Sequence, residues 1–197
     1  MDSNKALVEK LKEDGKIKSE KVEKAFLEVD REDFIPENYR DEAYVDKPVK
    51  ISDKATISAP HMIGIITEFL EIEDNSEVLE IGSGSGYQLA IISEIAKKAV
   101  GIEIDEKLVE ESRLRLGERD NVEIIHGSGF EEVDQKFDRI LFSCAVKKDK
   151  FKQAQEYLRD GGVIVAPVVQ LQGQILKKYK NGEISDHGFV RFIQFIE

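Results

Sequence analysis

The stretch from Val78 to Gln88, Val-Leu-Glu-Ile-Gly-Ser-Gly-Ser-Gly-Tyr-Gln, constrains the fold of this chain more than any other. Its apolar start is typical of a buried parallel strand, and it breaks into glycines at alternate positions, 82, 84 and 86. Beyond them, apolar residues recur with helical spacing from Leu89 to Ala96. A strand, a glycine turn and a helix bring backbone N–H groups and a helix N-terminus against a nucleotide-like ligand.

The spacing of these glycines narrows the class of ligand. The dinucleotide fingerprint requires a glycine where Tyr87 stands, and no Gly-Lys-Ser/Thr sequence makes a phosphate-binding loop. A carboxylate, Glu80, precedes the glycines instead. The pattern favours a ligand with an adenosine but no phosphates, S-adenosylmethionine, whose ammonium group a carboxylate can face. The alternative is a tight strand-to-helix turn that needs glycine only for its backbone dihedrals.

Length and charge exclude several other classes of protein. A chain of 197 residues is long enough for one sizeable core and short for two. With 40 acidic against 29 basic side chains the net charge is −11, which repels a polyanion, so we expect no nucleic-acid partner. No apolar run has the length of a membrane span or the form of a signal sequence. We therefore expect no membrane partner and a cytoplasmic location.

The N-terminal part is predicted to be helical, and the remainder alternates strands with helices. Two apolar stripes up to Val29, separated by Asp14-Gly15, indicate two helices, and Asp30 to Lys54 is interpreted as an ordered loop. A further helix begins near Pro60. Strands are expected at 78–81, 99–104, 122–125, 137–142, 163–168, 174–179 and 189–196, and helices at 89–96, 105–116 and 150–158.

This alternation predicts an α/β fold: a doubly wound, mostly parallel, Rossmann-like sheet with right-handed crossovers. Asn181-Gly182 between the last two strands predicts antiparallel pairing at one edge. We expect a single domain, with residues 1–75 as an N-terminal helical cap on the substrate side and residues 76–197 as the cofactor-binding core.

Two later segments match the ligand predicted for the glycine turn. Glu103 closes the second strand about twenty residues after the first glycine, where such folds place a carboxylate on the ribose hydroxyls. Gly127-Ser128-Gly129 follows the third strand and can lie against a base, with Ser128 accepting a hydrogen bond from an exocyclic amine. The alternatives are a solvated acid at a strand end and an ordinary glycine turn.

A third segment, Thr56 to Met62, places two hydroxyls and an imidazole before a helix. Thr56, Ser58 and His61, together with the free N–H groups of the helix start, make a plausible carboxylate-binding pocket. On composition alone a capping role is favoured, in which Ser58 or Thr56 satisfies the helix start and nothing more.

Metal and covalent chemistry find no support. His61, His126 and His187 are widely separated, and no pair has the spacing of metal ligands. Cys144, the only cysteine, follows an apolar strand and is interpreted as a packed side chain. We therefore predict neither a metal site nor a cysteine nucleophile.

Together these residues resemble the protein-L-isoaspartate O-methyltransferase family, whose S-adenosylmethionine-dependent members methylate isoaspartyl (and D-aspartyl) residues of damaged proteins. The resemblance extends from about Val29 onward, and the Thr-Ile-Ser-x-Pro segment is its diagnostic part. The motifs that carry it are Arg31-Glu32-x-Phe34-Ile35-Pro36, Ala43-Tyr44-x-Asp46, Thr56-Ile57-Ser58-Ala59-Pro60-His61-Met62, Leu79-Glu80-Ile81-Gly82-Ser83-Gly84-Ser85-Gly86-Tyr87-Gln88 and Phe189-Val190-Arg191-Phe192.

The resemblance implies a role for each segment. It makes Ser58 the catalytic residue, which holds the isoaspartyl carboxylate beside the methyl group in place of the capping role, with Thr56, Ile57 and His61 also binding substrate. The cofactor S-adenosyl-L-methionine, which leaves as S-adenosyl-L-homocysteine, is then bound by Glu80, Gly82, Ser83, Gly84 and Gly86 around its methionine part, Glu103 and Ile104 at the ribose, and Gly127, Ser128 and Gly129 at the base.

The same resemblance implies isoaspartyl-containing proteins and peptides as partners, and we expect a monomer. Because a carboxylate is already ionised at pH 7, the reaction needs no general base and depends on positioning and exclusion of water. That agrees with the absence of a catalytic dyad in the sequence.

Three segments depart from the family pattern. Family members usually show Gly-Asp-Gly where Ser128 stands, a small Ala-rich stretch where 143–148 stands, and a Val-Pro-Phe-type ending where 192–195 stands. Two other functions therefore stay open. One is a methyltransferase of the same fold that acts on another protein carboxylate or on a tRNA base, and the other is a protein that binds the cofactor without turnover.

Overall fold

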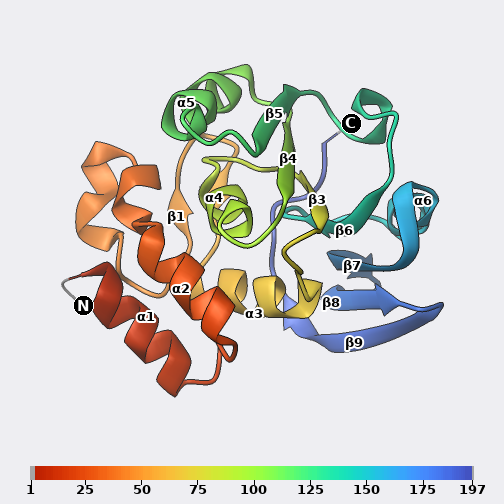
Figure 1. The fold of residues 1–197 in the computed structure, drawn as a ribbon, viewed down its shortest axis with the longest axis horizontal. Helices are drawn as coiled ribbons and strands as arrows, with labels where there is room; N and C mark the ends of the chain where they lie inside the picture. Colours follow the sequence, from red (N-terminus) through yellow and green to blue (C-terminus); the bar gives the residue numbers. More distant parts are fainter. Residues whose placement is uncertain (1–2, 197) are drawn as a thin grey trace.

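The computed structural model describes residues 3–196, which form a seven-stranded sheet with helices on both faces (Figure 1). The helices are α1 (Asn4–Glu13), α2 (Glu20–Glu28), α3 (Pro60–Leu70), α4 (Tyr87–Ser93), α5 (Glu106–Leu116) and α6 (Lys148–Gln153). The strands are β1 (Val49–Lys50), β2 (Thr56–Ile57), β3 (Glu77–Ile81), β4 (Lys98–Glu103), β5 (Val122–His126), β6 (Phe137–Phe142), β7 (Leu158–Gln170), β8 (Gly173–Lys180) and β9 (Glu183–Val190). Short 3₁₀ turns are η1 (Arg31–Phe34), η2 (Glu37–Glu42), η3 (Phe130–Glu132) and η4 (Ala154–Tyr157).

The order of the strands confirms a doubly wound, mostly parallel sheet. It runs β5-β4-β3-β6-β7-β8-β9, with parallel pairing from β5 to β7 and antiparallel pairing of β8 and β9. The chain leaves β3 for β4 and β5 on one side and returns to β6 on the other side of β3. In open α/β sheets, ligands bind at the carboxyl ends of the strands where the strand order reverses in this way. The segments after β3 and β6 therefore frame the predicted binding site.

Both faces of the sheet are covered, which explains why its strands read as continuous apolar runs. On one face, α1 to α4 and part of α5 pack onto the sheet in one cluster of buried side chains. On the other face, α6, η3 and η4 contribute to a second cluster that contains Phe130, Phe142 and Phe151. The N-terminal helices share the first cluster with α4 and the sheet. For example, the rings of Phe26 on α2 and Tyr87 on α4 meet edge to face, with their centres 6.3 Å apart.

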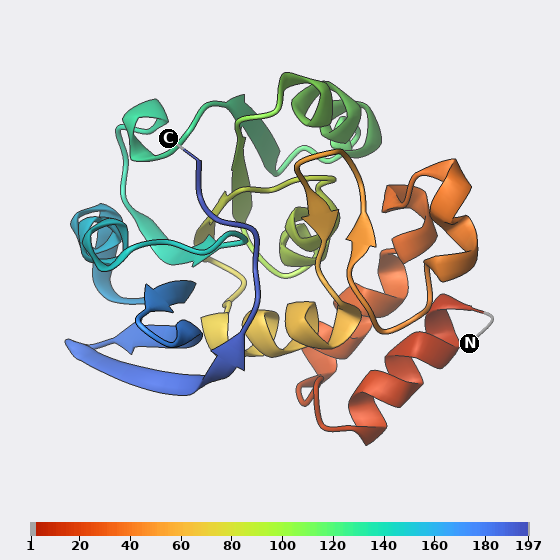
Figure 2. The ribbon, with the colours of Figure 1, turned by 180° about the vertical axis from the view of Figure 1, so that it is seen from behind.

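The predicted ordered loop between Asp30 and Lys54 contains regular structure that the sequence did not reveal. It includes η1, η2 and the strand β1, whose Val49 pairs with Ile57 of β2 in a small antiparallel hairpin. Viewed from behind, this hairpin lies beside the C-terminal segment and in front of the ends of the central strands (Figure 2). The hairpin therefore carries Thr56 to the end of the sheet where β3 and β6 diverge.

The last strand was predicted in the wrong place. It was expected at 189–196, but β9 spans Glu183–Val190. Asn181 and Gly182 have φ values of 51° and 85°, so they form a two-residue hairpin loop that sets Glu183 opposite Lys180. Pairing must then begin immediately after the loop, and the strand is complete at Val190. Residues 191–196 leave the sheet edge and cross to the end of the central strands instead (Figure 2).

Smaller differences concern the elements before it. The helix expected at 150–158 is α6 (Lys148–Gln153) followed by a 3₁₀ turn, because Leu158 already pairs with Phe137 of β6. The helix expected at 89–96 is α4 (Tyr87–Ser93). The strand expected at 163–168 is longer, since β7 spans Leu158–Gln170 and includes Gly161-Gly162 at an irregularity in its pairing with β6. The helix expected at 105–116 is α5, which Asp105 caps by accepting hydrogen bonds from Lys107 N and Leu108 N.

Candidate active site

Three adjoining cavities lie at the carboxyl ends of β3, β4, β5 and β6. The Glu103 cavity is lined by Gly82, Gly84, Glu103, Ile104, Ser128 and residues 193–196. The Glu80 cavity is lined by Glu80, Ser83, Ser85, Tyr87 and Gln88. The His61 cavity is lined by Ser58, His61, Met62 and residues 189–193. Thr56 and Ser143 line all three, so these two residues mark the point where the cavities meet.

Most of the residues predicted for the site come together here. Those that line at least one of the three cavities are Thr56, Ile57, Ser58, His61, Glu80, Gly82, Ser83, Gly84, Glu103, Ile104, Gly127 and Ser128. Gly86 and Gly129 line none of them. Gly86 precedes α4 with a φ of 85°, and a Cβ there would lie 2.8 Å from Leu116 Cδ1, so this glycine permits the close approach of α4 and α5.

The glycine turn after β3 is held by backbone hydrogen bonds. Gly82 N donates to Ile102 O at 2.8 Å, and Gly86 N donates to Ser83 O at 2.9 Å. Gly82 and Gly84 both have positive φ, which L side chains rarely adopt. Their bare backbone lines both the Glu80 and the Glu103 cavities, and a Cβ there would lie 3.4 Å from Cys144 Sγ for Gly82 and 3.3 Å from Ile51 Cδ1 for Gly84.

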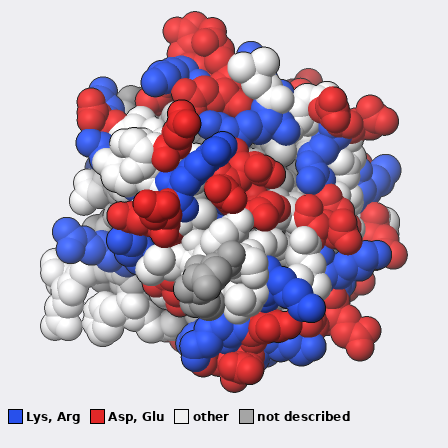
Figure 3. Space-filling model, turned by 90° about the vertical axis from the view of Figure 1, so that its left-hand side faces the viewer, with Lys and Arg blue, Asp and Glu red and all other residues white. Residues whose placement is uncertain are grey.

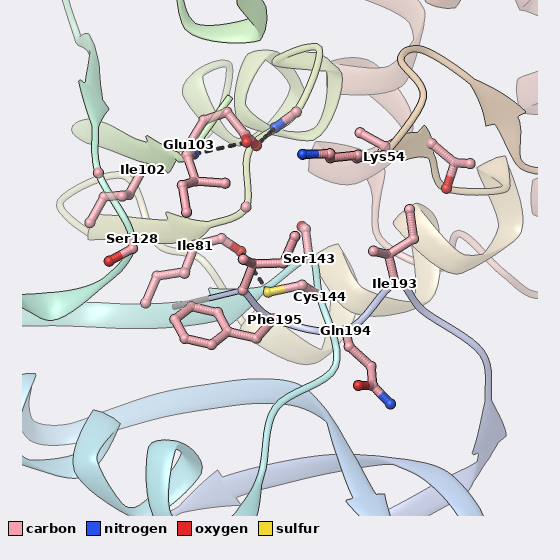
Figure 4. Close-up of a pocket in the computed structure, with 17 residues that line it drawn as sticks. Lys54, Ile81, Ile102, Glu103, Ser128, Ser143, Cys144, Ile193, Gln194 and Phe195 are labelled. Carbon is pink, nitrogen blue, oxygen red and sulfur yellow. Dashed lines mark hydrogen bonds between the residues drawn. The ribbon is translucent and has the colours of Figure 1, made fainter. Parts of the chain in front are cut away.

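Glu103 is buried, and its carboxylate is anchored by three backbone donors. Gly84 N donates to Oε2 at 2.8 Å, while Ile104 N and Asp105 N donate to Oε1 at 2.8 and 2.9 Å. Figure 4 shows this carboxylate at one end of the Glu103 cavity, with Lys54 reaching toward the same cavity from the opposite side. The bonds from Gly84 and Ile104 fix the carboxylate in position, so it is oriented before any ligand arrives.

Glu80 is in a different electrostatic state. Its side chain is 1% exposed, Ser143 Oγ donates to Oε1 at 2.6 Å, and Oε2 has no hydrogen-bond partner among residues 3–196. Burial raises the pKa of the Glu80 carboxyl to about 8, with the Ser143 hydrogen bond opposing and the nearby Glu103 charge adding to the shift. A ligand cation placed at Oε2 would supply the missing partner and favour the ionised form.

The capping role of Thr56 and Ser58 is wrong. The N-cap of α3 is Ala59, which has no side chain that could cap the helix; Ala59 O accepts the first helical hydrogen bonds from Met62 N and Ile63 N. Neither hydroxyl forms a hydrogen bond within the part of the chain that the structure describes. Both hydroxyls border cavities and are available to a ligand.

The helix start itself is not as free as predicted. One oxygen of Asp46, Oδ1, accepts both His61 N and His61 Nδ1 at 2.9 Å. The N–H group of His61 is therefore occupied, and its ring is held by a carboxylate that leaves Nε2 as the unengaged nitrogen. Asp46 lies in one of the motifs that carry the resemblance but was not predicted as a site residue. Only the fold brings its loop to the start of α3, so the sequence does not reveal its pairing with His61.

Three other contributors to the cavities were also missed. Ser143 and Cys144 follow β6, where the sequence departs from the pattern used for recognition. Residues 193–196 were placed in a strand, and Lys54 was placed in a loop. Each lines a cavity because of the position of its segment, and none carries a local sequence signal for that position.

The described residues offer no arrangement for metal chemistry. Among residues 3–196, no group of three or more His, Cys, Asp and Glu side chains gathers as metal ligands. Burial raises the pKa of the Cys144 thiol well above its ordinary value, which keeps it protonated. Within the same range, no helix has the length and apolar character needed to span a membrane.

Comparisons with known proteins agree on one family. A family model described as protein-L-isoaspartate(D-aspartate) O-methyltransferase (PCMT) matches residues 2–196. A protein-L-isoaspartate O-methyltransferase of Pyrobaculum islandicum is 37% identical over 199 residues, 96% of each chain. One of Dictyoglomus turgidum is 41% identical over 198 residues, which cover 96% of this chain and 89% of that protein.

Solved structures extend the likeness to the fold. A Plasmodium falciparum protein described as a beta-aspartate methyltransferase (PCMT), determined in complex with S-adenosyl-L-homocysteine, superimposes with a TM-score of 0.87 at 26% identity. The match covers 100% of this chain and 99% of that one. A second structure, named protein-L-isoaspartate O-methyltransferase, superimposes with a TM-score of 0.86 at 25% identity over 97% of this chain and 65% of that chain.

Proposed function

This chain belongs to the protein-L-isoaspartate(D-aspartate) O-methyltransferase family, and on that premise we propose that it methylates the free carboxylate of L-isoaspartyl and D-aspartyl residues in damaged proteins. The methyl donor is S-adenosyl-L-methionine, and the methyl ester formed initiates repair. The observation that carries the proposal is the meeting of three cavities at Thr56 and Ser143, with carboxylates on one side and hydroxyls and an imidazole on the other.

The residues of the Glu80 and Glu103 cavities fit this cofactor. Glu80 Oε2 is a buried acceptor without a partner in residues 3–196, which suits the ammonium of the methionine part. The backbone of Gly82 and Gly84 leaves room between the two cavities. Glu103 presents an anchored carboxylate, which suits the ribose hydroxyls.

The His61 cavity fits the acceptor carboxylate. The Ser58 hydroxyl is uncommitted and stands at the border of the His61 and Glu80 cavities, so it can donate to the carboxylate and hold it against the methyl-bearing side. His61, whose ring is oriented by the Asp46 carboxylate through Nδ1, lines the same cavity. Thr56 and Ile57 complete the wall between acceptor and cofactor.

The reaction asks these residues for positioning and for exclusion of water. When bound, S-adenosyl-L-methionine supplies a methyl group on a sulfonium, and a substrate carboxylate oxygen bonds to that methyl as the carbon–sulfur bond breaks, giving a methyl ester and S-adenosyl-L-homocysteine. The substrate carboxylate is ionised at neutral pH, so no residue of the chain has to remove a proton. The Ser58 hydroxyl restricts its orientation, and residues 189–196 contribute to the walls of the Glu103 and His61 cavities.

We further propose one domain, in which residues 1–75 form the cap and 76–197 the core, acting as a monomer in the cytoplasm. The buried cluster shared by α1, α2 and the sheet supports one domain. Over the face shown in Figure 3, Lys and Arg side chains are interspersed with Asp and Glu and form no continuous basic area there. With the net charge of −11, this supports isoaspartyl-containing proteins and peptides as partners in preference to nucleic acid.

The test is methyl transfer from labelled S-adenosyl-L-methionine to a peptide that contains isoaspartate, with the same peptide containing normal aspartate as control. We expect base-labile label on the isoaspartyl peptide alone. Absence of label, with S-adenosyl-L-homocysteine binding demonstrated by calorimetry, would contradict the proposal and favour another substrate or a protein that binds without turnover.

A further inference from the structure

The C-terminal segment 191–196 is fixed across the end of the sheet by hydrogen bonds at two places. Phe192 exchanges two hydrogen bonds with the Gln174 side chain, from Phe192 N to Oε1 at 2.6 Å and from Nε2 to Phe192 O at 3.0 Å. Further along, Ala145 N donates to Ile193 O at 2.7 Å and Phe195 N donates to Ala145 O at 2.9 Å. Residues 193–195 therefore lie parallel to the segment that follows β6, as an added edge of the site (Figure 2).

These bonds place the ring of Phe195 at the Ser128 end of the Glu103 cavity (Figure 4). Its Cζ atom lies 3.6 Å from the position that a Cβ of Gly129 would occupy, so the ring lies close to the turn after β5. The Lys150 ammonium lies over the ring, 5.4 Å from its centre, and pairs with Glu131 at 3.7 Å. The ring also packs against the second buried cluster. Phe195 is thus an oriented aromatic wall of the cavity.

The polar group at the same end is a neutral hydroxyl. Ser128 lines the cavity, whereas the carboxylates of Glu131 and Glu132 do not, and Glu103 is the one carboxylate among its lining residues in the described chain. A hydroxyl both donates and accepts, so Ser128 can pair with an amino group or with an oxo group on a purine. A carboxylate at this position would accept only.

Resting on the proposed function, we propose that the adenine ring of the cofactor packs against the ring of Phe195. Recognition of the base then depends on its aromatic surface more than on its 6-amino group. Stacking on an aromatic side chain is tolerant of the identity of the base because every base has a π-face. The donor–acceptor character of Ser128 adds to that tolerance. A purine nucleoside thioether with a 6-oxo group is therefore a second ligand of this site.

The experiment measures equilibrium binding by calorimetry, so that turnover plays no part. Its ligands are S-adenosyl-L-homocysteine and S-inosyl-L-homocysteine, whose bases differ at the 6-position, amino against oxo, and at the neighbouring N1, an acceptor in adenine and an N–H donor in hypoxanthine. For Phe195→Ala we expect S-adenosyl-L-homocysteine to bind about tenfold more weakly, for Phe195→Leu a smaller loss, and for Phe195→Tyr affinity within about twofold of wild type. Leu171→Ala, which removes an exposed apolar side chain from the β7–β8 turn, is the matched control and is expected to bind as wild type.

The second arm concerns selectivity for the base. We expect wild-type dissociation constants for the two ligands within about threefold of each other, and we expect Ser128→Asp to favour the 6-amino ligand by about tenfold or more, since a carboxylate accepts from the amine but repels the oxo group. Thermal unfolding of each variant reports whether the C-terminal segment still packs. Phe195→Leu keeps an apolar side chain and Phe195→Tyr keeps the aromatic ring, so together they distinguish loss of the aromatic contact from a general packing defect.

The outcomes separate this inference from the proposed function. Undiminished affinity of Phe195→Ala for S-adenosyl-L-homocysteine would overturn the aromatic contact. Rejection of the 6-oxo ligand by the wild-type protein would overturn the tolerance at the 6-position. Neither result bears on the proposed function. Failure of the wild-type protein to bind S-adenosyl-L-homocysteine at all would overturn the proposed cofactor, and this inference with it.

Discussion

The two walls of the candidate site are built in different ways. The cofactor wall, defined as Glu80, the glycine turn 82–86 and Glu103, comes from one continuous stretch of chain. It is joined by hydrogen bonds that backbone N–H groups of the turn donate, Gly82 N to Ile102 O and Gly84 N to the Glu103 carboxylate. The acceptor wall, defined as Asp46, Thr56 to His61 and residues 189–193, comes from three separated segments. Its joints are side chains, including the pair formed by His61 and Asp46.

The cofactor wall depends on residues close together in the sequence, whereas the acceptor wall depends on contacts made in the tertiary structure. A strand–turn–helix unit dictates the cofactor wall, because the sheet register sets Ile81 beside Ile102 and so brings the glycine turn to Glu103. The acceptor wall exists only when the hairpin β1–β2, the start of α3 and the segment after β9 converge. Variants in the two walls should therefore have separable effects on cofactor binding and on methyl transfer.

The largest expected effect is on the cofactor wall, from Glu80→Gln. This change keeps the shape of the side chain but removes the charge that faces the ammonium, so we expect the affinity for S-adenosyl-L-homocysteine to fall on the order of 100-fold. Calorimetric titration measures it. An affinity within about threefold of wild type would show that Glu80 Oε2 does not meet the ammonium.

The next effect is on the acceptor wall, from Ser58→Ala. Losing a hydrogen bond to a charged carboxylate should lower kcat/KM for an isoaspartyl peptide by roughly 10- to 100-fold, because such bonds contribute about 1.5–3 kcal/mol. Affinity for S-adenosyl-L-homocysteine should stay within about twofold of wild type. Ser58→Thr, which keeps the hydroxyl, is the matched control and should recover part of the activity. If the affinity for S-adenosyl-L-homocysteine fell as much as kcat/KM, the two walls would not have separable effects.

A smaller effect is expected from Asp46→Asn. An amide oxygen can still accept from His61 N, but a neutral acceptor holds the ring less firmly than a carboxylate does, so kcat/KM should fall by about 3- to 10-fold without loss of cofactor affinity. Asp53→Asn is the control, since Asp53 is 97% exposed and pairs only with Lys50. The value of kcat/KM for an isoaspartyl peptide should fall for Asp46→Asn and stay at the wild-type level for Asp53→Asn; equal values in the two variants would mean that the pair has no part in the reaction.

The smallest expected effect is the release of a fraction of one proton when the ligand binds. With a pKa of about 8, Glu80 is mostly protonated at pH 7 before ligand binds, and the ammonium should drive it to the ionised form. Binding of S-adenosyl-L-homocysteine should therefore release about 0.9 proton at pH 7 and about 0.1 at pH 9, the release falling as pH rises through 8. Calorimetry in buffers of different ionisation enthalpy measures it as the difference between wild type and Glu80→Gln. A difference that does not decline with pH would contradict the raised pKa.

Much of the cofactor wall could be predicted from the sequence because its signals are local. The positions of Glu80, Gly82, Gly84 and Glu103 follow from the spacing of glycines and carboxylates around two short apolar runs. Gly86 is the exception. Its partner, Leu116 on α5, is thirty residues away, and only the packed structure reveals that contact.

The acceptor wall was predicted in part, through the resemblance of residues 56–62 to a family segment. What that segment does locally was misread, because capping by Ser58 was favoured on composition while Ala59 begins the helix without a side-chain cap. Asp46, Ser143 and residues 193–196 carry no local chemical pattern for their positions, so none of them was predicted as a site residue, although the resemblance drew attention to their segments.

The sequence by itself determined the parallel α/β core, the glycine turn and the identity of the two acidic strand ends, because hydrophobic period, glycine dihedrals and strand-end placement are properties of short segments. The packed structure was needed to show that the Glu80 carboxyl accepts one hydrogen bond from residues 3–196 while the Glu103 carboxylate accepts three. It was also needed to show that Phe195 lies outside the predicted strand and borders the cavity. Burial, which sets the pKa of Glu80, and the course of the chain after a two-residue hairpin both depend on contacts between residues far apart in sequence, and no local pattern encodes them.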